Sequence, residues 1–361
     1  MTIDLSAVAE GGLGWLSGGG EHADVVLSTR VRLARNLDGI AFTSRAREGE
    51  RLRVLQMLRD AMPHLPSLQG GLLLRLEDLD QNDRRLLHER HLVSRELAAL
   101  DGGASKGGSA VFVGQGHGIM VNEEDHLRLQ TVRGGLATRA AVDALLAVDR
   151  EIGARLPYAY HEEFGFLTAC PTNTGTGLRA SVLIHLPGLV LTKEIGKVLS
   201  GLQAMGLTYR GLYGEGSEVI GNFFQISNQT TLGRSEDELV DHLHRVVSHV
   251  IKREHDARRV MWREAGYIIE DKLWRAYGTL RFARSLTFEE AMNYLSGVRL
   301  AVGLQLITGL SVATLNRLLI FSQPAHLGYA EGRVLGEEEA NVARARYVRE
   351  ALGAETDQAK H

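Results

Sequence analysis

The chain has 361 residues, of which 44% are hydrophobic, and a formal net charge of −3 at pH 7. This nearly neutral balance lacks the excess of positive charge that binds nucleic acids and anionic membranes, so neither is an expected partner. A single cysteine, Cys170, excludes an internal disulfide framework, and no signal peptide or apolar run near ~20 residues is visible, which favours a cytoplasmic protein.

Residues 1–23 are glycine-rich around "LSGGGEHAD" and are expected to form a short N-terminal arm. Polar and apolar residues then alternate in "VVLSTRVRLA", "HGIMVNEEDHLRLQTV" and "LRASVLIHLPG", as they do in half-buried strands. Helical patterns separate these strands at residues 51–62 and 139–156. Strands and helices together predict an α+β domain over residues 24–258.

The pattern changes at Ser235, which forms a helix-starting capping box with Glu238. A second capping box, Thr287 with Glu290, opens "TFEEAMNYLSGVRLAVG". Almost no strand pattern follows Ser235, so we expect an all-helical C-terminal domain over residues 259–361.

Three of the predicted strands carry arginine on a polar face opposite an apolar one. Ser28, Arg30 and Arg32 share one face of the first strand, because successive side chains point to opposite sides. Arg128 and Arg179 lie on the corresponding faces of the other two strands. A sheet that packs its apolar face on helices would gather these arginines on its open face as a polyanion site, suited to a nucleoside triphosphate. The alternative is a set of unrelated surface arginines paired with nearby acids.

Other nucleotide and metal motifs do not fit. No G-x-x-x-x-G-K-[ST] occurs, and "GTGLRA" matches G-x-G-x-x-A but enters a strand instead of opening a helix. The histidines His242, His244 and His249 lack the spacing of metal ligands, so no metal bound directly by the protein is expected.

The stretch "NEEDHLR" places Glu123, Glu124 and Asp125 in a break between two predicted strands, at the end of the arginine-bearing face. Acids beside a phosphate site suit a cationic acceptor, or a magnesium ion carried by the nucleotide. For Glu215, which lies between two glycines in "YGEGSE", the alternatives are a further acid of this site and an ordinary turn residue.

The motifs "STRVR", "NEEDHLR", "CPTNTGTGLRAS" and "RGLYGE" occur in this order, and through them the chain resembles the catalytic domain of the phosphagen (guanidino) kinases. "TNTGTGLRASVLIHLPGL" and "ISNQTTLGRSEDEL" resemble more specifically the bacterial protein arginine kinases of the McsB type. The resemblance covers nearly the whole chain and implies an antiparallel sheet flanked by helices, followed by the helical domain. Only about two dozen residues precede "VVLSTR", which leaves no room for the domain that closes over a small guanidino substrate. An arginine on a protein is therefore the expected acceptor.

The resemblance implies a role for each residue that matches a motif. Five arginines would grip the ATP phosphates: Arg30, Arg32, Arg128, Arg179 and Arg210. The residues that would complete the nucleotide pocket are Ser28, Thr29, Val31, His91, Ala180, Ser181, Val182, Leu183, Gly211, Leu212, Tyr213 and Gly214.

Four further residues would serve the acceptor. Glu124 matches the catalytic carboxylate, Glu123 the acid near the Mg²⁺ that ATP carries, and Glu215 a second guanidinium-binding acid. Cys170 matches a cysteine beside the acceptor nitrogen; without the resemblance it would be interpreted as a small buried hydrophobe. A guanidinium is a poor nucleophile because its pKa exceeds ~12, so carboxylates that align one nitrogen and accept its proton explain the acids in "NEEDHLR".

The resemblance also implies partners. Phosphorylated arginines would mark substrate proteins for a Clp-type unfoldase–protease, a zinc-finger activator would assist, and the chain would form a homodimer. Two alternatives stay open: a kinase of a free guanidino metabolite, and an inactive adaptor that binds phosphoarginine.

One motif departs from the McsB type. Those kinases carry R-D-x-x-R-A, whose arginine and aspartate form a second site for phosphoarginine. The matching stretch here is "ANVARA", in which Ala340 and Asn341 replace that pair while Arg344 and Ala345 remain. A working second site is therefore not expected.

Overall fold

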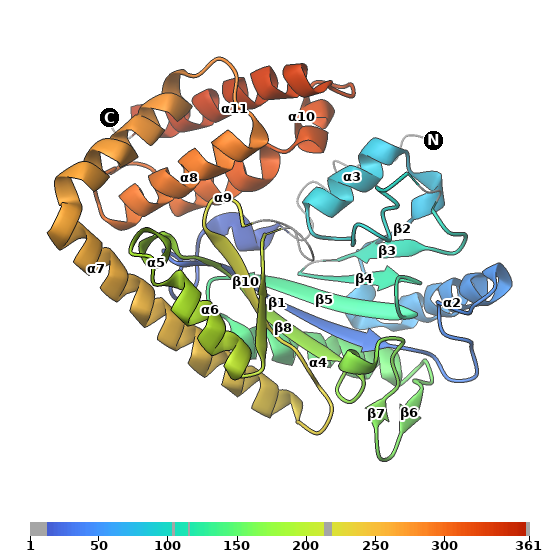
Figure 1. The fold of residues 1–361 in the computed structure, drawn as a ribbon. Coiled ribbons are helices and arrows are strands. Elements are labelled where there is room, and N and C mark those ends of the chain that lie inside the picture. Colours follow the sequence, from blue (N-terminus) through green and yellow to red (C-terminus); the bar gives the residue numbers. More distant parts are fainter. Residues whose placement is uncertain (1–12, 103–104, 115, 213–218, 359–361) are drawn as a thin grey trace.

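The computed structural model describes residues 13–102, 105–114, 116–212 and 219–358. Its centre is an eight-stranded antiparallel sheet with the order β2-β3-β4-β5-β1-β8-β10-β9 (Figure 1). The strands of this sheet are β1 (Val26–Arg35), β2 (Leu72–Arg75), β3 (Ala110–Val113), β4 (His117–Val121), β5 (Leu127–Gly134), β8 (Leu178–His185), β9 (Leu207–Arg210) and β10 (Phe223–Asn228). A separate hairpin consists of β6 (Tyr160–His161) and β7 (Gly165–Phe166).

Helices surround the sheet and fill the C-terminal part of the chain. They are α2 (Glu48–Ala61), α3 (Gln81–Glu89), α4 (Thr138–Gly153), α5 (Pro187–Leu191), α6 (Ile195–Ala204), α7 (Glu236–Phe282), α8 (Phe288–Gly303), α9 (Val312–Phe321), α10 (Pro324–Ala330) and α11 (Glu337–Gln358). The two helices predicted over residues 51–62 and 139–156 correspond to α2 and α4, so both predictions are confirmed to within a few residues.

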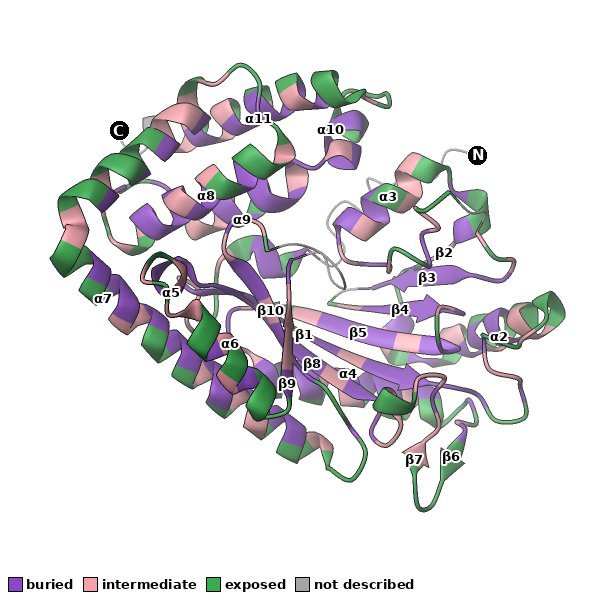
Figure 2. Ribbon diagram, viewed as in Figure 1, coloured by how far each residue is buried: buried purple, intermediate pink, exposed green. Residues whose placement is uncertain are grey.

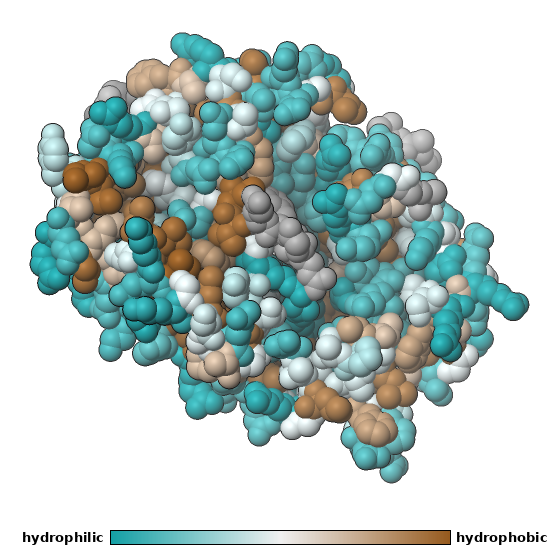
Figure 3. Space-filling view, in the orientation of Figure 1, coloured by the Kyte–Doolittle hydropathy of each residue, from teal (hydrophilic) through white to brown (hydrophobic). Residues whose placement is uncertain are grey.

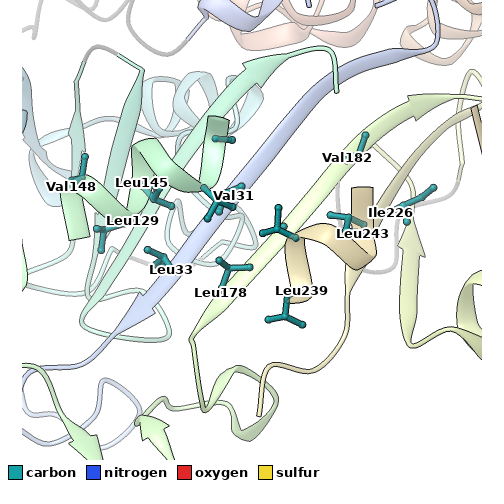
Figure 4. Packing of buried hydrophobic residues seen from close by; sticks show 14 of the residues in the cluster. Val31, Leu33, Leu129, Leu145, Val148, Leu178, Val182, Ile226, Leu239 and Leu243 are labelled. Carbon is teal, nitrogen blue, oxygen red and sulfur yellow. The ribbon is translucent and has the colours of Figure 1, made fainter. Parts of the chain in front are cut away.

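One face of the sheet forms the main core, because its strands alternate with period two. Val31 and Leu33 of β1 are fully buried on the side of the sheet that α4 covers, and Leu33 lies between Leu129 on one side and Leu178 on the other (Figure 4). Leu239 and Leu243 of α7 belong to the same buried cluster. Each such side chain contributes roughly 1.5–3 kcal/mol when removed from water. The opposite face carries the polar residues of the same strands, and this alternation leaves it open for a ligand.

The long helix α7 connects the sheet to the helical region. It begins at the predicted capping box, in which Ser235 and Glu238 exchange hydrogen bonds, and the box of Thr287 and Glu290 opens α8 in the same way. The helix kinks at Ala265, whose φ and ψ are −141° and 27°. The proposed domain boundary at residue 258 falls inside α7, so the division into domains stays a prediction.

The helices after the kink pack around a second hydrophobic cluster, which contains Leu273, Leu295, Leu318 and Leu352 together with Leu27, Leu183 and Phe223 of the sheet. The outer side of α7 and the tip of the β6–β7 hairpin are exposed, whereas the central strands are mostly buried (Figure 2). None of the helices in the described ranges is long and apolar enough to cross a membrane.

The described part of the predicted N-terminal arm packs closely on the rest of the molecule. A 3₁₀ turn at Gly14–Ser17 buries Trp15 and Leu16 against Ile320 of α9. The glycine-rich composition therefore did not predict that this segment packs on the molecule. Its two large apolar residues, Trp15 and Leu16, make the packing possible.

Candidate active site

Guanidinium groups gather on the open face of the sheet. Arg32 of β1 lies directly opposite Arg179 of β8 and Gln130 of β5, and Ala34 lies opposite Arg128. Residues paired across neighbouring strands share a face, so the strands place these arginines side by side as the alternation predicts.

A cavity of about 780 Å³ opens over these arginines. This volume lies within the range of small-molecule sites in proteins, ~300–1,000 Å³. The molecule is hollowed here between the helical region and α3, and the residues around the hollow are mostly hydrophilic (Figure 3). The cavity is lined by ten of the residues identified from the sequence, namely Arg30, Arg32, His91, Glu123, Glu124, Arg128, Cys170, Arg179, Arg210 and Leu212.

The electrostatics of the cavity favour an anion. Burial and the neighbouring Arg30 and Arg128 hold the pKa of Arg32 well below its usual value. Its buried Nε has no hydrogen-bond acceptor within the described ranges. A buried N–H group without an acceptor is costly, and phosphate oxygens would supply both an acceptor for it and negative charge beside the guanidinium.

Arg30 is oriented by a neutral partner. Gln130 Oε1 accepts hydrogen bonds from Nε and Nη2 of Arg30 at 3.1 and 2.5 Å. Burial, with Arg128 next, lowers the pKa of Arg30 to about 10, so this side chain stays charged at neutral pH. Burial and the nearby Arg30 lower the pKa of His91 to about 3, so His91 faces the cavity as a neutral ring.

The acids of "NEEDHLR" lie in the turn between β4 and β5, where Asn122 has a φ of 56°. Arg128 forms ion pairs with Glu123 at 2.6 Å and with Glu124 at 2.5 Å. Burial lowers the pKa of Arg128, but Glu123, Glu124 and Asp125 outweigh it and raise the pKa. The side chain of Glu123 is 7% exposed and that of Glu124 is 44% exposed, so Glu124 is the acid open to an acceptor.

Cys170 lies on the segment that leads into β8 and lines the same cavity. Its Sγ is 3.0 Å from Oγ1 of Thr172. The preceding residue, Ala169, donates its backbone N–H to Asp125 at 2.7 Å, and Asn36 donates to the same carboxylate oxygen at 2.7 Å. Asp125 therefore ties the cysteine segment to the acidic turn.

Family comparisons agree with this geometry. Residues 53–257 match the family described as ATP:guanido phosphotransferase, C-terminal catalytic domain. Residues 267–361 match the protein-arginine kinase McsB C-terminal domain. The chain belongs to the protein-arginine kinase family.

Its relatives span nearly its whole length. It is 44% identical over 349 residues to the protein-arginine kinase of Symbiobacterium thermophilum, covering 94% of this chain and 96% of the relative. It is 39% identical over 340 residues to that of Bacillus subtilis, covering 94% and 93%.

Solved structures of guanidino kinases share the fold. The duplicated taurocyamine kinase from Schistosoma mansoni, with bound transition state analog components, has a TM-score of 0.57 and 29% identity, covering 64% of this chain and 33% of the other. Lombricine kinase has a TM-score of 0.57 and 25% identity, covering 70% and 71%. The predicted antiparallel sheet flanked by helices is thus confirmed.

Some residues assigned to the nucleotide pocket of this kinase point away from it. The side chains of Thr29, Val31, Ala180 and Val182 lie on the opposite face of the sheet, and all four are 0% exposed. The expectation is corrected for these side chains, because only their main chain can reach a ligand on the open face.

The other assigned residues are placed as follows. Ser28 and Ser181 lie on the arginine-bearing face and are buried, and Leu183 is buried in the cluster that contains residues of the helical region. Gly211 is buried next to Leu212 at the end of β9. Tyr213, Gly214 and Glu215 lie outside the described residues.

The site also contains polar residues that the sequence analysis did not identify. Gln130 orients Arg30, and Thr172, Asn173 and Gln225 line the cavity. The period-two alternation could have identified Gln130, because this residue lies two positions after Arg128 and therefore on the same face of β5.

Proposed function

We propose that this kinase transfers the γ-phosphate of ATP to the side chains of arginine residues in proteins. One observation carries the proposal: a cavity lined by six arginines, among them the five identified from the sequence, also contains the exposed carboxylate of Glu124. The arginines suit a polyphosphate donor, and the carboxylate suits a guanidinium acceptor.

Each set of residues has its own task. Arg30, Arg32 and Arg179 would hold the phosphates and neutralise charge on the transferred group, which is most of what phosphoryl transfer requires. Glu124 would bind the acceptor guanidinium, align one nitrogen with the γ-phosphorus and accept the proton that this nitrogen loses. We propose Glu215 as the second acid of this clamp, and Cys170 as the thiol next to the acceptor nitrogen.

Mg²⁺ fits this site as an ion carried by the nucleotide. No group of three or more His, Cys, Asp or Glu side chains in the described part of the chain could hold a metal by itself. Phosphate oxygens would therefore supply most of the ligands, with Glu123 nearby. Bound in this way, Mg²⁺ would reduce the negative charge of the phosphates.

Several further expectations belong to this proposal. The resemblance to McsB-type kinases supports a Clp-type unfoldase as the consumer of the phosphorylated proteins, a zinc-finger protein as activator, and the cytoplasm as the location. A homodimer is supported by exposed apolar side chains on α7: Tyr267 is 86% exposed and Phe282 73%.

The direct test is mass spectrometry of a protein mixture incubated with the chain and MgATP, kept under non-acidic conditions. Phosphate should appear on protein arginines and be absent when Glu124→Gln replaces the wild type. A parallel incubation with free arginine separates the alternatives: phosphorylation of the free amino acid alone would favour a metabolite kinase. If neither acceptor gains phosphate while phosphoarginine binds, the inactive adaptor would replace our proposal.

A further inference from the structure

The helical region contacts the catalytic sheet domain directly beside the nucleotide cavity. α10 packs against α3, and Ala325 of α10 belongs to the same buried cluster as Leu87 and Val93 (Figure 1). α3 ends at Glu89, two residues before His91, which lines the cavity. α10 therefore contacts a helix whose last residue is separated by only one residue from His91 of the cavity.

Glu89 is the centre of this contact. It is 5% exposed, and its carboxylate accepts hydrogen bonds from the backbone N–H of Ala325 at 3.0 Å and of His326 at 3.2 Å. Nδ1 of His326 completes the set at 2.8 Å. A buried carboxylate is costly unless it is hydrogen-bonded, so this arrangement holds α10 in one position relative to the end of α3.

The protonation of His326 follows from its neighbours. Nε of Arg90 can only donate, and it lies 3.1 Å from Nε2 of His326. Nε2 is therefore the acceptor, and the ring proton is on Nδ1, from which it is donated to Glu89. Burial lowers the pKa of His326, which agrees with this neutral form. Arg90, His326 and Glu89 thus form one directed series of hydrogen bonds.

Gln130 connects His91 and Leu92, which follow Arg90, to the phosphate-binding face of the sheet. It is 2% exposed, and its Nε2 donates to the backbone oxygen of His91 at 3.0 Å and of Leu92 at 3.4 Å. Its Oε1 accepts from Arg30. No carboxylate among the described residues lies within ion-pair distance of Arg30. Gln130 therefore fixes the direction of this guanidinium without neutralising its charge.

We propose that Gln130 is a positioning residue for ATP, and that the docking of α10 on Glu89 sets how tightly Arg30 holds the phosphates. The path runs from His326 through Glu89, the turn at residues 90–92 and Gln130 to Arg30. It rests on the proposed function only in requiring that the cavity binds ATP. A partner or a movement that separates His326 from Glu89 would lower the affinity for ATP without touching the site.

The test compares substitutions at the two ends of the path. Gln130→Met keeps the side-chain volume and removes the hydrogen bonds to Arg30 and to the backbone of His91 and Leu92, and we expect the Kd for MgATP to rise about tenfold. His326→Phe keeps a ring and removes the side-chain bonds to Glu89 and Arg90, while the backbone N–H of residue 326 still reaches Glu89, and a rise of about three- to tenfold is expected. His326→Asn retains a donor near the position of Nδ1 and should restore the Kd to within about twofold of the wild type.

A matched control is available on the other side of the sheet. His244 of α7 is 3.0 Å from Thr138 of α4, so it also joins the long helix to the catalytic domain through a histidine. Because α4 covers the apolar face, His244→Phe should leave the Kd for MgATP unchanged. Melting curves of every variant without nucleotide would identify any that fails to fold. If Gln130→Met does not fold, the Kd values of His326→Phe and His326→Asn still test whether the docking of α10 affects ATP binding.

The decisive measurement is a double-mutant cycle, because a path requires coupling between its ends. Calorimetric titration should show that Gln130→Met/His326→Phe binds MgATP no more than about twofold more weakly than Gln130→Met alone. Steady-state kinetics should show the loss in KM for ATP, with kcat changed less than about threefold. The inference would be overturned if the Kd of the double variant rose by the product of the two single increases. It would also be overturned if a folded His326→Phe bound MgATP as tightly as His244→Phe. A wild-type chain that does not bind MgATP would instead contradict the proposed function itself.

Discussion

Arg32 of β1 and Arg179 of β8 lie directly opposite each other on the open face of the sheet. Like charges in this position destabilise a sheet, by roughly 0.2–1 kcal/mol relative to a neutral pair. Burial and the three neighbouring arginines all lower the pKa of Arg32, which expresses the same repulsion. The arrangement makes physical sense when a polyanion lies over the strands, so this pair should cost stability in the empty enzyme and provide affinity in the loaded one.

We therefore predict that Arg32→Gln raises the stability of the nucleotide-free kinase while it abolishes ATP binding. Loss of the repulsion should raise the melting temperature by about 1–2 °C. Arg133→Gln is a suitable control, because Arg133 is exposed on the same sheet and opposite Thr29. Calorimetry with and without MgATP measures both effects. A lower melting temperature for Arg32→Gln than for the control would show that the guanidinium stabilises the empty sheet.

The second prediction concerns Glu124, the most exposed of the three acids paired with Arg128. Glu124→Gln should reduce phosphoryl transfer about 10²–10⁴-fold, because the variant cannot accept the proton of the acceptor. Nucleotide affinity should change little. Glu162, an exposed acid of the β6–β7 hairpin, provides a control in Glu162→Gln. Turnover above a third of the wild type in Glu124→Gln would remove the proposed role.

Local patterns predict the face on which each arginine lies but not which residues become neighbours. Alternation in "VVLSTRVRLA" is enough to separate Arg30 and Arg32 from Val31. The position of Arg32 opposite Arg179 depends on the register between two strands that are distant in sequence, which no local pattern contains. The acid turn was predictable for the same reason as the strands, because it interrupts their alternation.

The docking of the helical region could not be predicted. Capping boxes identify where α7 and α8 begin, but the contact between Glu89 and His326 depends on how α10 returns to α3. The packed N-terminal segment could not be predicted for the same reason, since Trp15 is buried in a cluster with Ile320, which lies far along the chain. Such contacts arise from tertiary packing alone.

A third prediction concerns Cys170, the only cysteine in the chain. Its thiol lines the cavity next to Thr172, so alkylation should place a bulky group where the acceptor would bind and should inactivate the kinase. MgATP together with a protein substrate should slow the labelling. Cys170→Ser, which is not alkylated, controls for damage elsewhere. Full activity after stoichiometric labelling would return Cys170 to a packing role.

The fourth prediction is a pH dependence of stability that arises from buried histidines. Burial, followed by the charges of Arg299 and Arg258, lowers the pKa of His185 well below its usual value. In the unfolded chain this ring takes up a proton near pH 6.5, whereas in the folded chain it stays neutral. Stability is therefore fully present above about pH 6.5 and is lost as the pH falls, by at most about 1.4 kcal/mol per pH unit for each such histidine.

His185→Phe should reduce this slope by about one proton, because phenylalanine keeps the stacking on Phe223 and does not titrate. Urea unfolding between pH 5 and pH 8 measures the slope for both proteins. An identical slope in the wild type and in His185→Phe would exclude His185 as a source of the acid sensitivity.

The last prediction concerns the altered motif "ANVARA". Arg344 keeps its place in the motif but is 1% exposed, and it donates to the backbone oxygens of Ser322 and Leu286 at 2.8 Å each. It also donates to Oδ1 of Asn341 at 2.7 Å. These bonds tie α11 to two neighbouring segments, so Arg344 stabilises the helical region and is not presented to a ligand. Ala340 is 4% exposed and has no group that binds phosphate.

We accordingly expect that free phosphoarginine neither activates this kinase nor changes its assembly state. Titration of phosphoarginine into kinase assays and into light-scattering measurements tests both parts. Arg344→Ala is a poor probe of ligand binding here, because it would leave two buried carbonyl oxygens without their donor and destabilise the fold. Asn341→Asp is better suited, since it restores one acid of the motif in a partly exposed position. We expect phosphoarginine to leave the activity of both proteins unchanged. A phosphoarginine site would persist in altered form if phosphoarginine activated the wild-type kinase saturably and activated Asn341→Asp more strongly.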